Sequence, residues 1–315
     1  MGDNVYAGIV MFLLGFTGFA ANLTVFLFLL HRKTTSRSFS YLAMNLAISD
    51  IMNPSVFGFT IAPIVILNID APRLLTRHLG QICFFSYDYC NINHLLITGN
   101  RFTSLYFPMK YPRIFTPRHT FIMCATSLTL AIIKSMFEQV IFECSSSVPL
   151  GSWNFVQENR HPFCPDYLFF SRFVYLLTLE AGVFILDIAT LIKFKRLKKG
   201  QQGVAYKSSS KARQEYLFII QTICQTVCFY CELTSYYIFA GFSWMAGPWQ
   251  QFILKSGIWI SVHMLDGIIT LSCNRDFKAA FKRRVCCGKA RVTSEAVSVI
   301  TGNNFTGSKK TVTSA

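Results

Sequence analysis

Apolar residues along this chain gather into seven blocks, separated by short polar or charged joins. The blocks span about 6–30, 38–67, 79–106, 119–142, 166–192, 214–240 and 249–273. Each block has at least the ~20 residues that an α-helix needs to cross about 30 Å of hydrocarbon. Only 14% of the 315 residues are charged, whereas a soluble domain has about 25%. The pattern predicts an all-α, integral membrane bundle of seven transmembrane helices.

The basic residues are distributed unevenly over the joins. The joins after blocks one, three and five, together with the tail after block seven, hold 23 Lys and Arg residues, whereas the N-terminus and the other joins hold 3. Because basic joins stay in the cytosol, we expect the N-terminus outside and the C-terminus inside. The basic join 193–213 is expected to attract anionic membrane lipid. Nucleic-acid binding is excluded, since it requires the basic residues on one folded face.

Polar residues inside two of the blocks fall on single helix faces. In block 79–106 they recur at steps of three or four, at Asp88, Asn91, His94, Thr98 and Arg101. In block 249–273 the corresponding positions are Lys255, Trp259, His263 and Asp266. This spacing predicts two stripes that face the interior of the bundle. Asp50 is a carboxylate near mid-bilayer in block 38–67, so we expect it to be paired or to share a polar cavity.

Arg101 stands at the inner end of its block, where lipid gives way to cytosol, within Asn100-Arg101-Phe102. An arginine in a membrane-length segment is costly and by default marks a functional position with a partner. The alternative is an arginine that snorkels to the lipid headgroups. The residues of this segment do not distinguish a paired arginine from a snorkelling one.

Three groups of residues in the chain point to one family. They are Asn100-Arg101-Phe102 with Phe107-Pro108-Met109-Lys110-Tyr111, the segment from Cys144 to Cys164 that encloses Ser152-Trp153, and His263-Met264-Leu265-Asp266-Gly267-Ile268-Ile269-Thr270 with Asn274-Arg275-Asp276-Phe277. In this order and at these membrane positions they resemble the nematode serpentine chemoreceptors of class X (Srx type). That group is a divergent branch of the rhodopsin-like G-protein-coupled receptors. The likeness extends over nearly all of residues 6–285.

The resemblance implies a receptor on chemosensory neurons that couples external chemicals to a heterotrimeric G protein, at the plasma membrane of the sensory cilia. By that likeness Asn100, Arg101 and Phe102 form the coupling segment. Arg101 is paired in the inactive bundle and released towards the G protein, and we take Glu215 as its partner. Asp50 and Asp266 are assigned to the activation machinery. The aspartate at the place of Asp50 helps to hold a sodium ion in rhodopsin-like receptors.

The chain also departs from the rhodopsin-like pattern. Asn100 replaces the usual acid beside the arginine, which puts the local salt bridge of that family in doubt. Asp266-Gly267-Ile268-Ile269-Thr270 stands where those receptors have Asn-Pro-x-x-Tyr, so the bending proline and the switch tyrosine are both absent. How the seventh helix moves is left open by these differences.

We expect a pocket for a small-molecule ligand where the polar stripes converge in the outer half of the bundle. Polar groups in a concave, mostly apolar site suit small organic molecules. The expected wall consists of Tyr87, Asp88, Glu138, Arg172, Glu232, Lys255, Trp259 and His263. The alternative is that several of these groups pair with one another and seal the bundle.

Cysteines mark the outer loop and the start of the tail. On the outer side we prefer a disulfide between Cys144 and Cys164, and Cys83 paired with either one is the second choice. After block seven we expect an interfacial helix at about 275–285, with Cys286 and Cys287 as palmitoylation sites. We expect 1–285 to be the receptor domain and 286–315 a disordered cytosolic tail.

Two other classes of protein use polar groups inside a membrane. A channel or transporter that works without a G protein is the alternative function, although the blocks show no internal repeat of the kind that builds many transporters. A membrane metallohydrolase is disfavoured because no H-x-x-x-H or similar short ligand motif is present. We therefore predict neither an enzyme nor a cofactor or metal.

Overall fold

The structure is a computed structural model. It describes residues 2–31, 37–159, 161–200, 210–274 and 277–279. The chain divides into two units, Met1–Cys273 and Asn274–Ala315. In the second unit residues 277–279 are helical, and the Phe277 N–H donates to Asn274 Oδ1 over 3.2 Å. The rest of the expected interfacial helix, the two cysteines Cys286 and Cys287 and the tail 286–315 lie outside the described residues.

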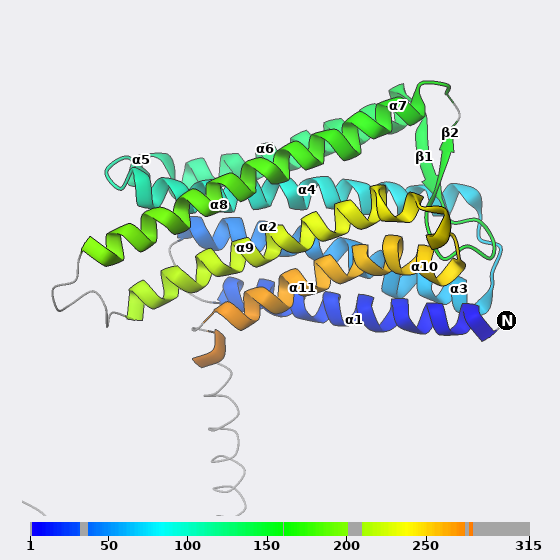
Figure 1. The fold of residues 1–315 in the computed structure, drawn as a ribbon, viewed down its shortest axis with the longest axis horizontal. Helices are drawn as coiled ribbons and strands as arrows, with labels where there is room; N and C mark the ends of the chain where they lie inside the picture. Colours follow the sequence, from blue (N-terminus) through cyan, green and yellow to red (C-terminus); the bar gives the residue numbers. More distant parts are fainter. Residues whose placement is uncertain (1, 32–36, 160, 201–209, 275–276, 280–315) are drawn as a thin grey trace, which may run out of the picture. The chain divides into compact units, whose positions relative to one another are not determined.

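The first unit is built from long helices with a small sheet at one end (Figure 1). The first half of the chain supplies α1 (Gly2–His31), α2 (Arg37–Val56), η1 (Phe57–Ile61), α3 (Ala62–Leu67), α4 (Arg73–Tyr106), α5 (Tyr111–Ile114), α6 (Pro117–Met136), η2 (Phe137–Ile141), β1 (Cys144–Ser147) and β2 (Val156–Asn159). The second half supplies α7 (Cys164–Leu168), η3 (Phe169–Val174), α8 (Tyr175–Gly200), α9 (Ser210–Tyr237), η4 (Phe239–Gly241), η5 (Ser243–Met245), α10 (Pro248–Phe252), η6 (Ile253–Gly257) and α11 (Ile258–Cys273).

Six helical segments in the described part of the chain are long and apolar enough to cross a membrane. They are Gly2–His31, Ser38–Leu67, Pro117–Ile141, Cys164–Lys199, Arg213–Gly241 and Pro248–Cys273. The remaining long helix, α4, has 34 residues, and with its polar stripe it is not among these apolar segments. Its stripe residues Asp88, Asn91, His94, Thr98 and Arg101 are all buried, as the spacing predicts. A polar helix of this length is acceptable because its neighbours shield it from lipid.

Helix α4 lies in the middle of the packing. It contacts α2, α6, α8 and α9, and its first turns meet β1. Around it, α1 packs on α2 and α11, and α8 and α11 each pack on α9. The two ends of the bundle differ: β1 and β2 lie at one end and α5 at the other (Figure 1). We call them the hairpin end and the Arg101 end, after the residue described below.

Four π-helical segments interrupt the long helices of the described residues: η1, η2, η3 and η6. The first follows Pro54, and Pro63 lies at the start of α3, so this distortion of the span falls between the two prolines. The segments η2 and η3 carry Glu138 and Arg172. π-turns change the direction in which side chains point and occur often at functional sites.

A β-hairpin closes the hairpin end, which the sequence pattern did not predict. Strands β1 and β2 pair antiparallel, with Cys144 opposite Asn159 and Ser147 opposite Val156. Glu158 of β2 accepts hydrogen bonds from Arg73, Arg77 and Ser147. Burial alone raises the pKa of the Glu158 carboxyl, but these donors outweigh it and lower the pKa to about 2. The hairpin is thereby attached to the start of α4.

Helix α1 approaches η1 very closely at Gly15. A Cβ atom at this position would lie 2.6 Å from Gly58 Cα, 2.7 Å from Gly58 N and 2.7 Å from Pro54 O. All three are backbone atoms, which cannot move aside as a flexible side chain can. The contact therefore requires glycine on the α1 side.

Gly15→Ala is expected to destabilise the bundle by about 1–3 kcal/mol, because α1 must move away from η1. The measurement is the thermal unfolding midpoint of the purified chain in detergent. Gly182→Ala in α8 is the matched control, since a Cβ there meets nothing within 4 Å. Alanine is also the better helix former, by up to about 1 kcal/mol, so this control should hold or gain stability. Equal midpoints for the two variants would contradict the close approach.

Candidate functional site

Arg101 is enclosed at its end of the bundle by three side chains. Its guanidinium carbon lies 4.2 Å from the ring centroid of Phe39 in α2 and 4.4 Å from that of Phe218 in α9. Its Nη1 donates a hydrogen bond to Glu215 Oε2 over 3.3 Å. The Arg101 side chain is 11% exposed and that of Glu215 is 32% exposed. Arg101 is therefore held between α2 and α9, whereas a snorkelling arginine would extend to the headgroups.

The neighbours of Arg101 hold the same end of α4 to other segments. Asn100 Nδ2 donates to Tyr111 Oη in α5 over 3.4 Å. The ring of Phe102 stacks on that of Tyr106, with centroids 4.4 Å apart. Tyr106 Oη in turn donates to the carbonyl oxygen of Ala189 in α8 over 3.1 Å. Of the expected coupling segment, Arg101 contacts Glu215, while Asn100 contacts α5 and Phe102 packs on the Tyr106 that bonds to α8.

The middle of the bundle contains a buried polar cluster from three helices, which we call the central cluster. Its members are Asp50 of α2, Cys90 and His94 of α4, and His263 and Asp266 of α11. His263 Nδ1 lies 2.8 Å from Asp50 Oδ1, to which Cys90 Sγ donates over 3.1 Å. His94 Nε2 lies 3.4 Å from Asp266 Oδ2. Asp50 is paired and shares a polar site, as its place in the sequence predicts.

Glu138 connects the polar side chains nearer the hairpin end. Its Oε1 accepts from Lys134 Nζ over 2.8 Å and from Ser171 Oγ over 3.0 Å. Its Oε2 accepts from Arg172 Nε and Nη2 over 3.3 and 3.0 Å. Lys134 Nζ also donates to Asp88 Oδ2 over 2.7 Å. Lys134 and Glu138 therefore belong to a chain of four charges that joins α4, α6 with η2, and η3.

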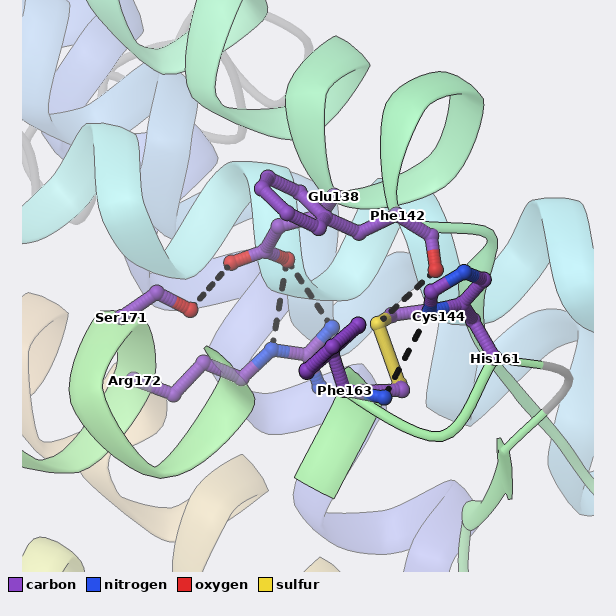
Figure 2. Close-up of a disulfide and its surroundings, with 8 residues drawn as sticks. Glu138, Phe142, Cys144, His161, Phe163, Ser171 and Arg172 are labelled. Carbon is purple, nitrogen blue, oxygen red and sulfur yellow. Dashed lines mark hydrogen bonds and ion pairs between the residues drawn. A yellow bond between two sulfur atoms is a disulfide. The ribbon is translucent and has the colours of Figure 1, made fainter. Parts of the chain in front are cut away.

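A disulfide lies in the same region as Arg172 (Figure 2). It joins Cys144, at the start of β1, to Cys164, at the start of α7, with Cα atoms 5.6 Å apart. Cys83 is a free, buried thiol in α4. Figure 2 shows the Glu138 carboxylate between Ser171 and Arg172, with the yellow sulfur–sulfur bond next to it. The preferred pairing is thus the one present, and it attaches the hairpin to α7.

A cavity of about 20 Å³ lies between the central cluster and the hairpin end. Its wall consists of Phe84, Tyr87, Asp88, Arg172, Leu176, Glu232, Tyr236, Tyr237 and Trp259. Tyr87 Oη donates a hydrogen bond to Glu232 across it. Among the described residues, two buried donors of this wall have no hydrogen-bond partner, Arg172 Nη1 and Trp259 Nε1. The space holds about one water molecule.

The structure brings five of the eight expected ligand residues to this wall: Tyr87, Asp88, Arg172, Glu232 and Trp259. The other three are not part of it. Glu138 is occupied by Lys134, Ser171 and Arg172, and His263 lies in the central cluster beside Asp50. Lys255 Nζ is directed to the ring of Tyr236, 6.0 Å from its centroid. The i+4 spacing of Lys255, Trp259 and His263 gives the face of the helix but not the depth of each residue along the bundle.

Comparison with solved structures shows the class of fold. The chain is similar to the crystal structure of squid rhodopsin, with a TM-score of 0.74 at 15% sequence identity, over 91% of this chain and 87% of that chain. This likeness establishes the rhodopsin-type fold of seven transmembrane helices, and it agrees with the predicted all-α bundle.

The family follows from the sequence comparisons. The profile of the family described as serpentine type 7TM GPCR chemoreceptor Srx matches residues 12–274, so the chain belongs to that family. Two relatives from Caenorhabditis elegans are serpentine receptor class X 45 and serpentine receptor class X-43. The first is 27% identical over 88% of this chain and 80% of its own length, and the second is 22% identical over 88% and 86%. The chain is thus a multi-pass membrane protein of a nematode chemoreceptor family.

Proposed function

We propose that this chain is a chemosensory receptor that binds a small external chemical at the cavity and activates a heterotrimeric G protein through Arg101. The observation that carries the proposal is the arrangement of α4. This helix supplies Tyr87 and Asp88 to the cavity and Arg101 to the ion pair with Glu215. Tyr87 and Arg101 are 14 residues apart, or about 21 Å along a helix. One rigid element thus joins a site for a ligand to a closed ion pair.

The ligand chemistry follows from the wall of the cavity. Rings of Phe84, Tyr87 and Trp259 supply apolar surface, with Trp259 centroids 4.8 and 5.9 Å from the other two. The donors Arg172 Nη1 and Trp259 Nε1 suit an oxygen or nitrogen acceptor on the ligand. Because the cavity holds about one water, a ligand enters only when the side chains around it separate. This requirement couples ligand binding to a shift of α4 against η3 and α9.

The Arg101 end supplies the chemistry for the partner. An Arg released from Glu215 presents five N–H donors in a fixed plane, which suits carbonyl and carboxylate groups of a partner helix. The basic joins support the orientation in which this end faces the cytosol and the hairpin end faces outside. The proposal includes the plasma membrane of sensory-neuron cilia as the location, since the family is described as one of chemoreceptors.

A channel or transporter is the competing function, and G-protein dependence separates it from a receptor. Cells that express the full chain with several G-protein subtypes are exposed to pools of small soluble and volatile chemicals, while second messengers and membrane current are recorded. We expect a chemically evoked messenger response that disappears when the Gα subunits are removed. A current that one of the pools evokes, and that persists without any G protein, would contradict the proposal.

A further inference from the structure

The central cluster contains more donor atoms than its hydrogen bonds use. Within the described residues, Asp50 Oδ2, His263 Nε2 and Asp266 Oδ1 have no hydrogen-bond partner, and His94 Nε2 has only the 3.4 Å contact with Asp266 Oδ2. An unpaired buried polar atom costs about 1–3 kcal/mol. Three such atoms and one long contact at one place in the bundle leave donor atoms that a further group can use.

Two overlapping sets of donors in the cluster have the spacing of a metal site. In the set of Asp50, Cys90 and His263, the ligand atoms all lie within 4.8 Å of one another. The same limit holds for the set of Cys90, His94 and Asp266. In a tetrahedral zinc site the ligand atoms are roughly 3.5 Å apart, given metal bonds of about 2.0–2.3 Å. Small side-chain rotations therefore suffice to close either set on one ion.

The sodium ion that the fold suggests for Asp50 does not suit these donors. Sodium is a hard cation that prefers oxygen ligands, as the other hard cations do. Three of the five cluster residues offer imidazole nitrogen or sulfur. The donor set fits a borderline-soft ion much better than sodium.

We infer that the central cluster binds one divalent ion of the zinc class, with Cys90 as the ligand common to both sets. Imidazole and thiolate are the ligands that zinc prefers in proteins, and carboxylate completes the set. Cys90 donates its thiol proton to Asp50 in the structure, so binding of the ion as thiolate releases this proton to solvent.

Such an ion joins three helices between the cavity and Arg101. Its ligands come from α2, α4 and α11, and α4 is the element that the proposed signal uses. A bound ion therefore restrains the motion of α4 against α2 and α11. The metal inference itself rests on the donor geometry and holds whether or not the chain activates a G protein.

The test uses the full chain purified in detergent, treated with chelator and then titrated with Zn²⁺ or Co²⁺. Zinc about 100-fold above its dissociation constant should raise the unfolding midpoint by roughly 5 °C. Cobalt should give the near-ultraviolet absorption of a cobalt–thiolate bond, with about one ion per chain. Cys90→Ser should lose this absorption, and the variant of the histidine in the set that holds the ion, His94→Asn or His263→Asn, should weaken cobalt binding at least 10-fold.

Cys124→Ser is the matched control, since Cys124 is a buried free thiol of α6 outside the cluster, and it should keep the absorption. The wild-type spectrum alone decides the inference if a cluster variant fails to fold. No thiolate absorption at saturating Co²⁺ would overturn it. So would stabilisation by sodium but not by zinc, or zinc stabilisation of equal size in the wild type and Cys90→Ser, which would indicate an adventitious surface ion only.

Discussion

Glu215→Gln is expected to raise the ligand-independent rate of G-protein nucleotide exchange about fivefold. The change removes the charge that Arg101 Nη1 contacts at 3.3 Å and leaves the shape of the side chain unchanged. A partly exposed ion pair contributes about 1 kcal/mol, and this free energy shifts a two-state equilibrium about fivefold. Arg101 retains its contacts with Phe39 and Phe218, so the arginine itself stays available to the partner.

A charge swap tests whether the two residues act as a pair. Arg101→Glu and Glu215→Arg are made singly and together, and basal exchange is measured at matched receptor density. We expect the double variant to lie closer to the wild type than the sum of the single effects predicts. Glu143→Gln is the control, because Glu143 is exposed and precedes the disulfide cysteine Cys144 at the other end of the bundle. Additive effects of the two changes would remove the pairing.

Glu138→Gln is expected to have the largest effect on the stability of the bundle. Glu138 accepts from Arg172, whose side chain is 5% exposed, and from Lys134, whose side chain is 17% exposed, and its own side chain is 3% exposed. Removing one charge of a buried network costs about 3–5 kcal/mol, because its partners remain buried without compensation. Since proteins are stable by only about 5–15 kcal/mol, we expect most of the receptor to be lost from the cell surface. Surface labelling and the thermal midpoint in detergent measure the effect.

The same network predicts a partial rescue. In the Glu138→Gln variant Arg172 loses its carboxylate partner, and the further change Arg172→Met removes this unpaired cation. Lys134 still has the Asp88 carboxylate as a partner, at 2.7 Å. The double variant should therefore recover part of the surface expression. Glu143→Gln again serves as the control, since it changes an exposed carboxylate. If Glu138→Gln had the stability of the wild type, the negative charge of Glu138 would not be needed to stabilise Lys134 and Arg172.

The fold was largely predictable because length and hydrophobicity act locally along the chain. A run of about 20 apolar residues has no stable alternative in a bilayer except a helix. The stripe of α4 was also predictable, since Asp88, His94 and Arg101 repeat with the helical period and are all buried. The π-turns were not, and η2 and η3 are the segments that direct Glu138 and Arg172 towards each other. Such turns have no distinct pattern of hydrophobicity.

The partners of the site residues were harder to predict, because they come from distant parts of the sequence. Lys134 and Glu138 are recognisable as an i,i+4 pair, and Asp88, Glu138 and Arg172 were expected together in one wall, but the sequence does not specify which of these charges pair. Phe39 and Phe218, the two rings around Arg101, look like ordinary core residues. His94 and His263 are 169 residues apart, so a search for short metal motifs misses the central cluster. The hairpin was missed because its strands have only four residues each.

The most direct test of the account is stimulated nucleotide exchange with purified components. The full chain and its Arg101→Ala variant are reconstituted in lipid vesicles with heterotrimeric G proteins and exposed to the same pools of chemicals. Arg118→Ala is the control, because this arginine is exposed at the start of α6. The account predicts stimulation by an active pool in the wild type and Arg118→Ala, and none in Arg101→Ala. Stimulation of equal size in Arg101→Ala, at matched amounts of folded receptor, would contradict it.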